Sequence, residues 1–141
     1  MDTTTIIQIA KKEGDAINRH DADAYAAGYA ADATAYDPQY PELLKGREAI
    51  RKDIVDFFTA FPDVQAKVLS IVVSDNTLAF EVEMSGTHKG PLLTPTGTIP
   101  ATNKPMQMRG GRFMRINAEG MIVECNRYYD LLGIMYQLGL M

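Results

Sequence analysis

The sequence predicts an α+β fold in which N-terminal helices cover a cone-shaped, curved antiparallel sheet. Apolar residues recur at helical spacing in the first part of the chain. After about residue 64 the period changes to the alternation that is typical of strands, and turn-forming residues separate the segments. Helices followed by an antiparallel sheet are the chain order of an α+β fold, and a bent sheet under helices leaves a conical space that suits a small molecule.

Three helices are expected before the sheet. Residues 4–19 carry an apolar stripe, and the threonines in front of it are candidate N-caps. Asp21 or Asp23 can cap a second, alanine-rich helix that continues through Ala30. A third helix is expected over residues 47–60, where the apolar positions repeat at helical spacing and a proline follows closely.

The sheet is expected from four segments with strand patterns: 64–73, 77–87, 106–116 and 121–129. Residues 74–76 and 117–120 have turn chemistry and join neighbouring segments. Residues 90–105 are rich in proline, glycine and threonine, which predicts an irregular loop or a broken hairpin. A short helix over 131–138 closes a single domain that spans residues 1–141.

Composition narrows the class of protein. The chain has 141 residues, 46% of them hydrophobic, and a net charge of −4, which is typical of a globular protein rather than a nucleic-acid or membrane binder. No apolar run is long enough to span a bilayer, and the N-terminus lacks the pattern of a signal peptide. The single cysteine, Cys125, fits a reducing compartment, so a cytoplasmic location is expected.

Motifs for metal or cofactor binding are not found. Two distant histidines and one cysteine give no zinc spacing. The sequence also has no glycine-rich phosphate loop and no nucleophile elbow. We therefore expect any chemistry to need neither a metal nor a cofactor.

Several separated motifs resemble the SnoaL-like polyketide cyclase family, and they occur in the family's order along nearly the whole chain. They lie at residues 33–38, 46–50, 86–92, 100–102, 120–124, 128–130 and 137–139. The first two are also similar to ketosteroid isomerases of the same nuclear-transport-factor-like superfamily. The resemblance implies the cone-shaped α+β fold, a small-molecule site and homodimers or homotetramers. The superfamily also hosts hydrolases and non-catalytic binders, so the fold alone assigns no reaction.

This chain has different residues at the two positions where the family's cyclases carry their acid–base residues. In the family's cyclases an aspartate on the last strand and a histidine on the preceding strand carry out the acid–base steps. By the resemblance these positions are Arg127 and Arg112. A guanidinium keeps its proton near neutral pH, so this pair does not carry over.

The resemblance to ketosteroid isomerases implies a different pair of catalytic residues, Asp37 and Arg112. Their general base lies in an aspartate-proline motif, which Asp37-Pro38 matches, and their oxyanion-stabilising acid corresponds to Arg112. The tyrosine of their first helix corresponds to Glu13. A carboxylate base that faces a fixed cation suits removal of a proton next to a carbonyl. In this hypothesis Asp37 removes the proton, Arg112 holds the oxyanion, Arg127 orients the ligand and His88 relays a proton.

Each of these residues also has an ordinary structural interpretation. Asp37 before a proline is typical of an Asx turn, and His88 beside the proline-rich loop can anchor loop backbone. Arg112 and Arg127 can instead be neutralised inside the protein, for which the candidate carboxylates are Glu81, Glu83, Glu124 and Asp130. Asp130 is also placed to be the N-cap of the last helix.

Four tyrosines are candidates to offer hydroxyl groups to a ligand: Tyr25, Tyr29, Tyr36 and Tyr128. Aromatic side chains in a small core also simply fill space. Two inward guanidiniums would favour a carboxylate, enolate or phenolate, so the expected ligand is small, hydrophobic and potentially anionic.

The leading hypothesis is therefore an isomerase, cyclase or lyase that acts on a hydrophobic carbonyl compound. One alternative is a non-catalytic binding or dimerisation module of the same fold, in which internal carboxylates saturate both arginines and little open volume remains. Another is a hydrolase for epoxides or esters, which requires two carboxylates around one water, and only Asp37 is evidently placed for that. Self-association is expected through the outer face of the sheet.

Overall fold

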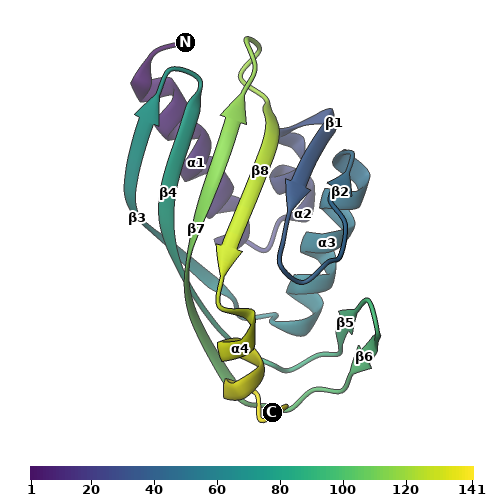
Figure 1. The fold of residues 1–141 in the computed structure, drawn as a ribbon. Helices are drawn as coiled ribbons and strands as arrows, with labels where there is room; N and C mark the ends of the chain where they lie inside the picture. The colour runs from purple at the N-terminus through teal and green to yellow at the C-terminus, as the bar shows by residue number, and fades with distance from the viewer.

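A six-stranded, curved sheet packed against helices organises the chain (Figure 1). The computed structural model describes residues 1–141. The elements are α1 (Thr3–Asn18), α2 (Ala22–Ala27), β1 (Tyr29–Tyr36), β2 (Leu44–Lys45), α3 (Arg47–Ala60), β3 (Gln65–Ser74), β4 (Thr77–Thr87), β5 (Leu92–Thr94), β6 (Gly97–Ile99), β7 (Pro105–Ile116), β8 (Ile122–Tyr129) and α4 (Leu131–Gln137). The helix predicted over residues 47–60 is α3, and the strand predicted over 77–87 is β4, each with the predicted bounds. The α+β prediction is confirmed.

The strands of the large sheet lie in the order β2-β1-β8-β7-β4-β3, and its two edges do not close. Neighbouring strands are antiparallel except for β1 and β8, which are parallel. The expectation of a purely antiparallel sheet is therefore wrong for this one pair. Most of the chain separates β1 from β8, and a crossover of that kind permits the parallel direction. Helices α1, α2 and α3 cover one face of the sheet, and α4 lies at its end beyond β8 (Figure 1).

Aspartates cap the N-termini of α1, α2 and α4, whereas Gly46 precedes α3 without a side-chain cap. The Asp2 side chain accepts a hydrogen bond from the Thr5 backbone N–H at 2.8 Å, so the prediction of threonine caps for α1 is wrong. Asp21 caps α2 and Asp130 caps α4 in the same way. A short carboxylate satisfies the free N–H groups of a first helical turn and favours its positive end.

The second helix is shorter than its composition predicts. It ends at Ala27 instead of running through Ala30, and β1 begins at Tyr29. The Gly28 carbonyl oxygen accepts a hydrogen bond from the Ile122 N–H at 2.9 Å, which starts the pairing of β1 with β8. Alanine favours helix locally, but pairing with a distant strand overrides that preference.

The proline-rich segment contains a small hairpin. Strands β5 and β6 pair with each other apart from the large sheet. The hairpin projects from the lower part of the molecule, on the side of α3 (Figure 1). Of the two alternatives left open by the sequence, the hairpin is therefore the one that forms.

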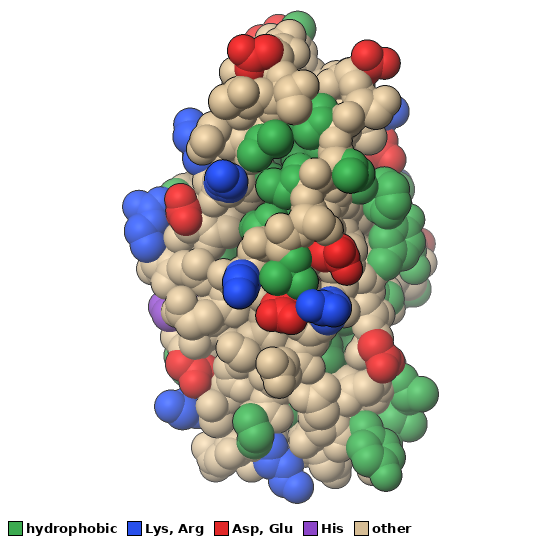
Figure 2. All heavy atoms as spheres, turned by 90° about the vertical axis from the view of Figure 1, so that its left-hand side faces the viewer, with side chains coloured by type: hydrophobic (Ala, Val, Ile, Leu, Met, Phe, Trp, Pro, Cys, Tyr) green, Lys and Arg blue, Asp and Glu red, His purple; other side chains and the backbone are tan.

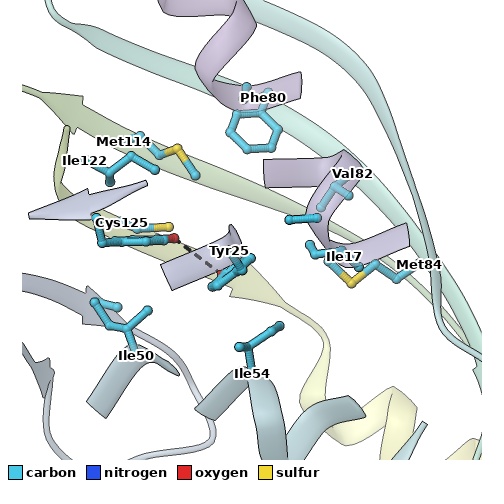
Figure 3. Packing of buried hydrophobic residues seen from close by; sticks show 14 of the residues in the cluster. Ile17, Tyr25, Ile50, Ile54, Phe80, Val82, Met84, Met114, Ile122 and Cys125 are labelled. Carbon is cyan, nitrogen blue, oxygen red and sulfur yellow. Dashed lines mark hydrogen bonds between the residues drawn. The ribbon is translucent and has the colours of Figure 1, made fainter. Parts of the chain in front are cut away.

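The main core fills the space between the helices and the concave face of the sheet. Figure 3 shows side chains of α1, α3 and three strands converging there: Ile17, Ile50, Ile54, Phe80, Val82, Met84, Met114, Ile122 and Cys125. Tyr25 lies among them, and its hydroxyl is hydrogen-bonded (Figure 3). Apart from His88, the buried polar side chains gather around Tyr25.

The surface mixes charges of both signs. On the side shown in Figure 2, acidic and basic side chains are interspersed among polar and apolar ones. None of the helices has both the length and the hydropathy that crossing a bilayer requires.

Candidate active-site cavity

A cavity of about 90 Å³ lies between the helices and the concave face of the sheet. Of the 24 residues that line it, 16 are hydrophobic. The apolar wall includes Ile54, Phe57, Val82, Met84 and Met108. The charged lining residues are Asp37, Asp53, Asp56, Arg112 and Arg127. An apolar hollow with a few convergent polar groups is the usual form of a small-molecule site.

Arg112 and Arg127 enter the cavity from neighbouring strands. They are register partners across β7 and β8, so both side chains leave the sheet on the same face. Alternation along β7 also buries Met114 on that face and exposes Phe113 on the other. The two arginines are 7% and 5% exposed, which makes them the only buried cations of the protein. The prediction that both point inward agrees with these positions.

Arg127 joins two carboxylates. Its Nη1 donates to Asp37 Oδ2 at 3.0 Å and to Asp53 Oδ2 at 2.7 Å, and its Nη2 donates to the Tyr25 hydroxyl at 3.3 Å. Its Nε is buried and has no partner. The guanidinium is thus fixed on three sides by groups from the loop after β1, from α2 and from α3.

Arg112 is held from one side only. Its Nη1 donates to Glu13 Oε1 at 2.5 Å and to the Tyr25 hydroxyl at 3.2 Å. Its Nη2 and Nε have no partner within the protein, and neither is among the polar atoms sealed from solvent. Because Arg112 lines the cavity, these N–H groups are available to a ligand.

Asp37 combines the two roles that the sequence left open. Its Oδ1 accepts a hydrogen bond from the Gln39 backbone N–H at 2.9 Å, the contact of an Asx turn. The same oxygen accepts from the Tyr129 hydroxyl at 2.6 Å, and Oδ2 accepts from Arg127. The turn places the carboxylate at the start of the loop after β1, and it borders the cavity.

Asp53 was missed by the sequence reasoning. It lies on α3 beside Ile54, with both residues turned toward the cavity. Its Oδ1 accepts a hydrogen bond from the Tyr40 hydroxyl at 2.6 Å, and its Oδ2 accepts from Arg127. A charged residue next to the apolar stripe of an amphipathic helix was the available signal, but most such residues face solvent.

Glu13 and the two inner tyrosines form a chain behind the arginines. Tyr29 donates to Glu13 Oε2 at 2.5 Å, and the Tyr25 and Tyr29 hydroxyls are 3.3 Å apart. The one proton of Tyr29 is directed mainly at Glu13, since the contact with the Tyr25 hydroxyl is the longer of the two. The residue that corresponds to the isomerase tyrosine is therefore a buried carboxylate that holds Arg112 in place.

Burial and charge reinforce the protonated form of these groups. Burial raises the pKa of Tyr25 and of Tyr29, and it also raises the pKa of Tyr40 and Tyr129, each of which faces an aspartate. Burial opposes the charge of Arg112, but Glu13, Tyr25 and Cys125 together outweigh it, so the pKa of Arg112 lies above its ordinary value. These hydroxyl and guanidinium groups therefore remain donors.

His88 lies elsewhere. It is fully buried in the loop after β4, and it is not among the residues that line the cavity. Its Nδ1 contacts the Thr102 hydroxyl at 3.0 Å and accepts from the Thr102 N–H at 3.2 Å, and its ring packs on Phe61. Burial lowers the pKa of His88. This geometry agrees with the loop-anchor interpretation and gives no path for the proposed proton relay.

Two of the four candidate tyrosines lie on the outer face of the sheet. The Tyr36 and Tyr128 rings are 5.4 Å apart, and Tyr128 packs edge-on against Phe113. Tyr128 borders the cavity, but its side chain is half exposed and its hydroxyl joins no hydrogen bond of the network. Tyr25 therefore stays a candidate ligand contact, Tyr29 lies behind it, and Tyr129 takes the position expected of Tyr128.

The carboxylates that neutralise the arginines are not the four expected from the sequence. Glu83 pairs with Arg109, Glu124 with Arg115, Glu81 accepts from Ser70, and Asp130 is a cap. An internal network does form, as the non-catalytic alternative requires, but it coexists with an open cavity. No three His, Cys, Asp or Glu side chains are grouped as a metal site.

The comparisons with known proteins agree with this architecture. The family model described as SnoaL-like polyketide cyclase matches residues 8–138. No curated protein matches the chain. The chain therefore belongs to the SnoaL-like polyketide cyclase family, as its motifs predicted.

Solved structures with low sequence identity share the fold. TsrD from Streptomyces laurentii is 21% identical, with a TM-score of 0.85 over 100% of this chain and 99% of that one. A Catenulispora acidiphila protein with a ketosteroid isomerase-like fold, solved with trimethylamine, is 20% identical, with a TM-score of 0.78 over 95% and 94%. The epoxide hydrolase/cyclase-like enzyme SalBIII is 18% identical, with a TM-score of 0.76 over 93% and 95%.

Proposed function

We propose that the protein is a cyclase-type enzyme that removes a proton next to the carbonyl of a small hydrophobic compound, without a cofactor. The observation that carries this proposal is the polar end of the cavity. There a carboxylate, Asp37, and the free N–H groups of Arg112 border the same apolar hollow. One supplies a base, and the other supplies donors where oxyanion charge develops.

The network assigns a distinct task to each group. Asp37 takes the proton from the carbon next to the carbonyl, and the electron pair of that C–H bond becomes the enolate. Arg112 donates from Nη2 or Nε to the enolate oxygen. Arg127 and the Tyr129 hydroxyl hold Asp37 in position through hydrogen bonds of 3.0 and 2.6 Å. Return of the proton to another carbon gives isomerisation. Attack of the enolate carbon on a second carbonyl moves the electron pair of that C=O bond onto its oxygen, which takes the proton back from Asp37, and this gives ring closure.

The test is hydrogen–deuterium exchange next to a carbonyl. Wild-type protein in D₂O is expected to accelerate exchange of the methyl protons of acetophenone, a single-ring ketone, as followed by proton NMR. Asp37→Asn should lower the rate by about 10²- to 10⁴-fold, since the base is lost. Asp32→Asn is the matched control, because Asp32 lies exposed on β1, the strand that leads to Asp37. Equal rates for Asp37→Asn and wild type would contradict the assignment.

A second candidate function is the opening of an epoxide, and Asp53 is the observation that favours it. The sequence provided only one placed carboxylate, whereas Arg127 Nη1 contacts both Asp37 and Asp53. The two carboxylates can together orient one water and take its proton as it attacks an epoxide carbon, and the opened epoxide oxygen then receives that proton. SalBIII, an epoxide hydrolase/cyclase-like enzyme, shares the fold. Turnover of styrene oxide that is lost in Asp53→Asn and kept in Asp32→Asn would favour this reaction over enolisation.

Self-association through the outer face of the sheet is part of the proposal. Tyr36, Phe113 and Tyr128 form an exposed aromatic row there, and Val72 is 67% exposed on β3. Exposed apolar area of this kind is typical of an interface. Sedimentation should give a dimer or tetramer for the wild type and a monomer for Phe113→Glu; a wild-type monomer at micromolar concentration would contradict it.

A further inference from the structure

The buried network carries one negative charge in excess. Its anions are Glu13, Asp37 and Asp53, with side chains 4%, 9% and 13% exposed, and its cations are Arg112 and Arg127, with side chains 8% and 6% exposed. Charges this far from water are costly unless they are paired. Three carboxylates against two guanidiniums leave one of them without a compensating cation.

The hydrogen bonds indicate that all three carboxylates are ionised. Each carboxylate accepts a hydrogen bond from a guanidinium, and its other oxygen faces a tyrosine hydroxyl, an arrangement that favours the ionised form. The donors are Arg112 and Tyr29 to Glu13, the Gln39 N–H, Tyr129 and Arg127 to Asp37, and Tyr40 and Arg127 to Asp53. The tyrosines hold their own protons, because burial raises the pKa of each.

No other side chain around the cavity balances this charge. The remaining charged lining residue is Asp56, which is paired with Lys52 at 2.7 Å and so adds no net charge. The buried Cys125 beside the network is also neutral, because burial raises the pKa of its thiol. The excess negative charge therefore belongs to the cavity itself.

The free N–H groups of Arg112 should bind an uncharged ligand more readily than an anion. A carbonyl oxygen fills the Nη2 or Nε donor site and leaves the buried charge as it was. A carboxylate fills the same site but doubles the excess negative charge in a region of low dielectric, where repulsion is strong. The two inward guanidiniums, taken alone, predicted the opposite preference.

The proposed reaction leaves the net charge of the buried network and its ligand unchanged. When Asp37 takes a proton from the ligand, the aspartate loses its negative charge and the ligand oxygen at Arg112 gains one. The charge of the whole cavity is unchanged, so neither a buried anion nor a second proton has to be brought in from water. A ligand that arrives as an anion lacks this compensation.

Resting on the proposed function, we infer that the cavity selects neutral carbonyl compounds and rejects carboxylates of the same shape, with Glu13 setting that selectivity. Glu13 acts without touching the ligand, because it lies behind Arg112 and is not among the lining residues. It is therefore a specificity-determining residue that the sequence did not single out for any role toward the ligand.

The test compares acetophenone with benzoate, which has the same ring and a charged group in place of the ketone. Each is titrated into the protein at neutral pH and followed by protein NMR shifts. Wild-type protein should bind acetophenone about tenfold or more tightly than benzoate. Glu13→Gln should improve benzoate binding about tenfold and change acetophenone binding by less than about threefold. Glu119→Gln, on the exposed β7–β8 turn, is the matched control and should change neither.

The outcomes distinguish failure of the charge-selectivity inference from failure of the proposed function. Equal affinities of the wild type for both probes would overturn the charge-selectivity inference and leave the proposed function standing. An equal effect of Glu13→Gln on both probes would overturn the role of Glu13. Binding of neither probe to wild-type protein would overturn both the cavity function and the inference that rests on it. The wild-type comparison is decisive by itself if Glu13→Gln fails to fold.

Discussion

Arg112 of β7 and Arg127 of β8 stand opposite each other in the sheet register, and both donate to one oxygen, the Tyr25 hydroxyl, at 3.2 and 3.3 Å. Two like charges this close require an acceptor between them and anions on either side. Tyr25 supplies the first, and Glu13 with Asp37 and Asp53 supplies the second. The polar end of the cavity is therefore one connected structure, and single changes in it should act on both stability and binding.

Loss of the shared acceptor should destabilise the protein. Tyr25→Phe keeps the ring but leaves two buried guanidinium groups each short of an acceptor, so the free energy of unfolding should fall by about 1–3 kcal/mol. Urea denaturation measures this change. Tyr36→Phe is the control, because Tyr36 is partly exposed and its hydroxyl makes no internal hydrogen bond; it should change stability by less than about 0.5 kcal/mol.

The buried pair of Arg112 and Glu13 should be coupled. Arg112→Met leaves the Glu13 carboxylate buried without its cation and should cost about 3–5 kcal/mol. Adding Glu13→Gln removes the unpaired charge and should restore most of that loss. A double-mutant cycle by chemical denaturation measures the coupling, and strictly additive effects would show that the pair is not a unit.

Two adjacent glycines of β7 should differ sharply. A Cβ at Gly110 would lie 2.7 Å from the Tyr128 carbonyl oxygen and 3.0 Å from the Tyr129 Cβ, whereas the nearest atom to a Cβ at Gly111 is 4.0 Å away. Gly110→Ala should therefore cost about 1–3 kcal/mol, because β8 must move. Gly111→Ala should stay within about 0.5 kcal/mol. Thermal unfolding of the two variants checks the contrast, and equal losses would contradict it.

His88 should make stability depend on pH. Burial lowers the pKa of His88 below its ordinary value of 6.5, so near pH 6 the unfolded chain binds more protons than the folded one. Its contribution is complete above about pH 6.5 and is lost as the pH falls toward the lower, folded value. His88→Gln should flatten the fall in melting temperature between about pH 7 and 5, while His20→Gln should keep it. An unchanged slope in His88→Gln would contradict this account.

Local patterns in the sequence predicted most of the architecture. The helix over 47–60 and the strand over 77–87 follow from periodicity and turn residues, because both signals act within a few residues of the chain. The strand from Tyr29 to Tyr36 could not be found in this way. Its alanines favour helix, and pairing with β8, distant in sequence, and with the short β2 makes it a strand.

The candidate site also has a part that local sequence patterns predicted and a part that they did not. The sequence alone determined the turn at Asp37, since a proline motif is local, and its resemblance to the SnoaL-like family implied the inward direction of Arg112 and Arg127. Only the tertiary structure decided which carboxylates contact the arginines. Glu13 of α1 is 99 residues from Arg112 in the chain, and Asp53 of α3 is 74 residues from Arg127. It also separated His88 from the cavity. The sign of the buried charge depends on that packing, because it is a sum over residues that the chain brings together only when it folds.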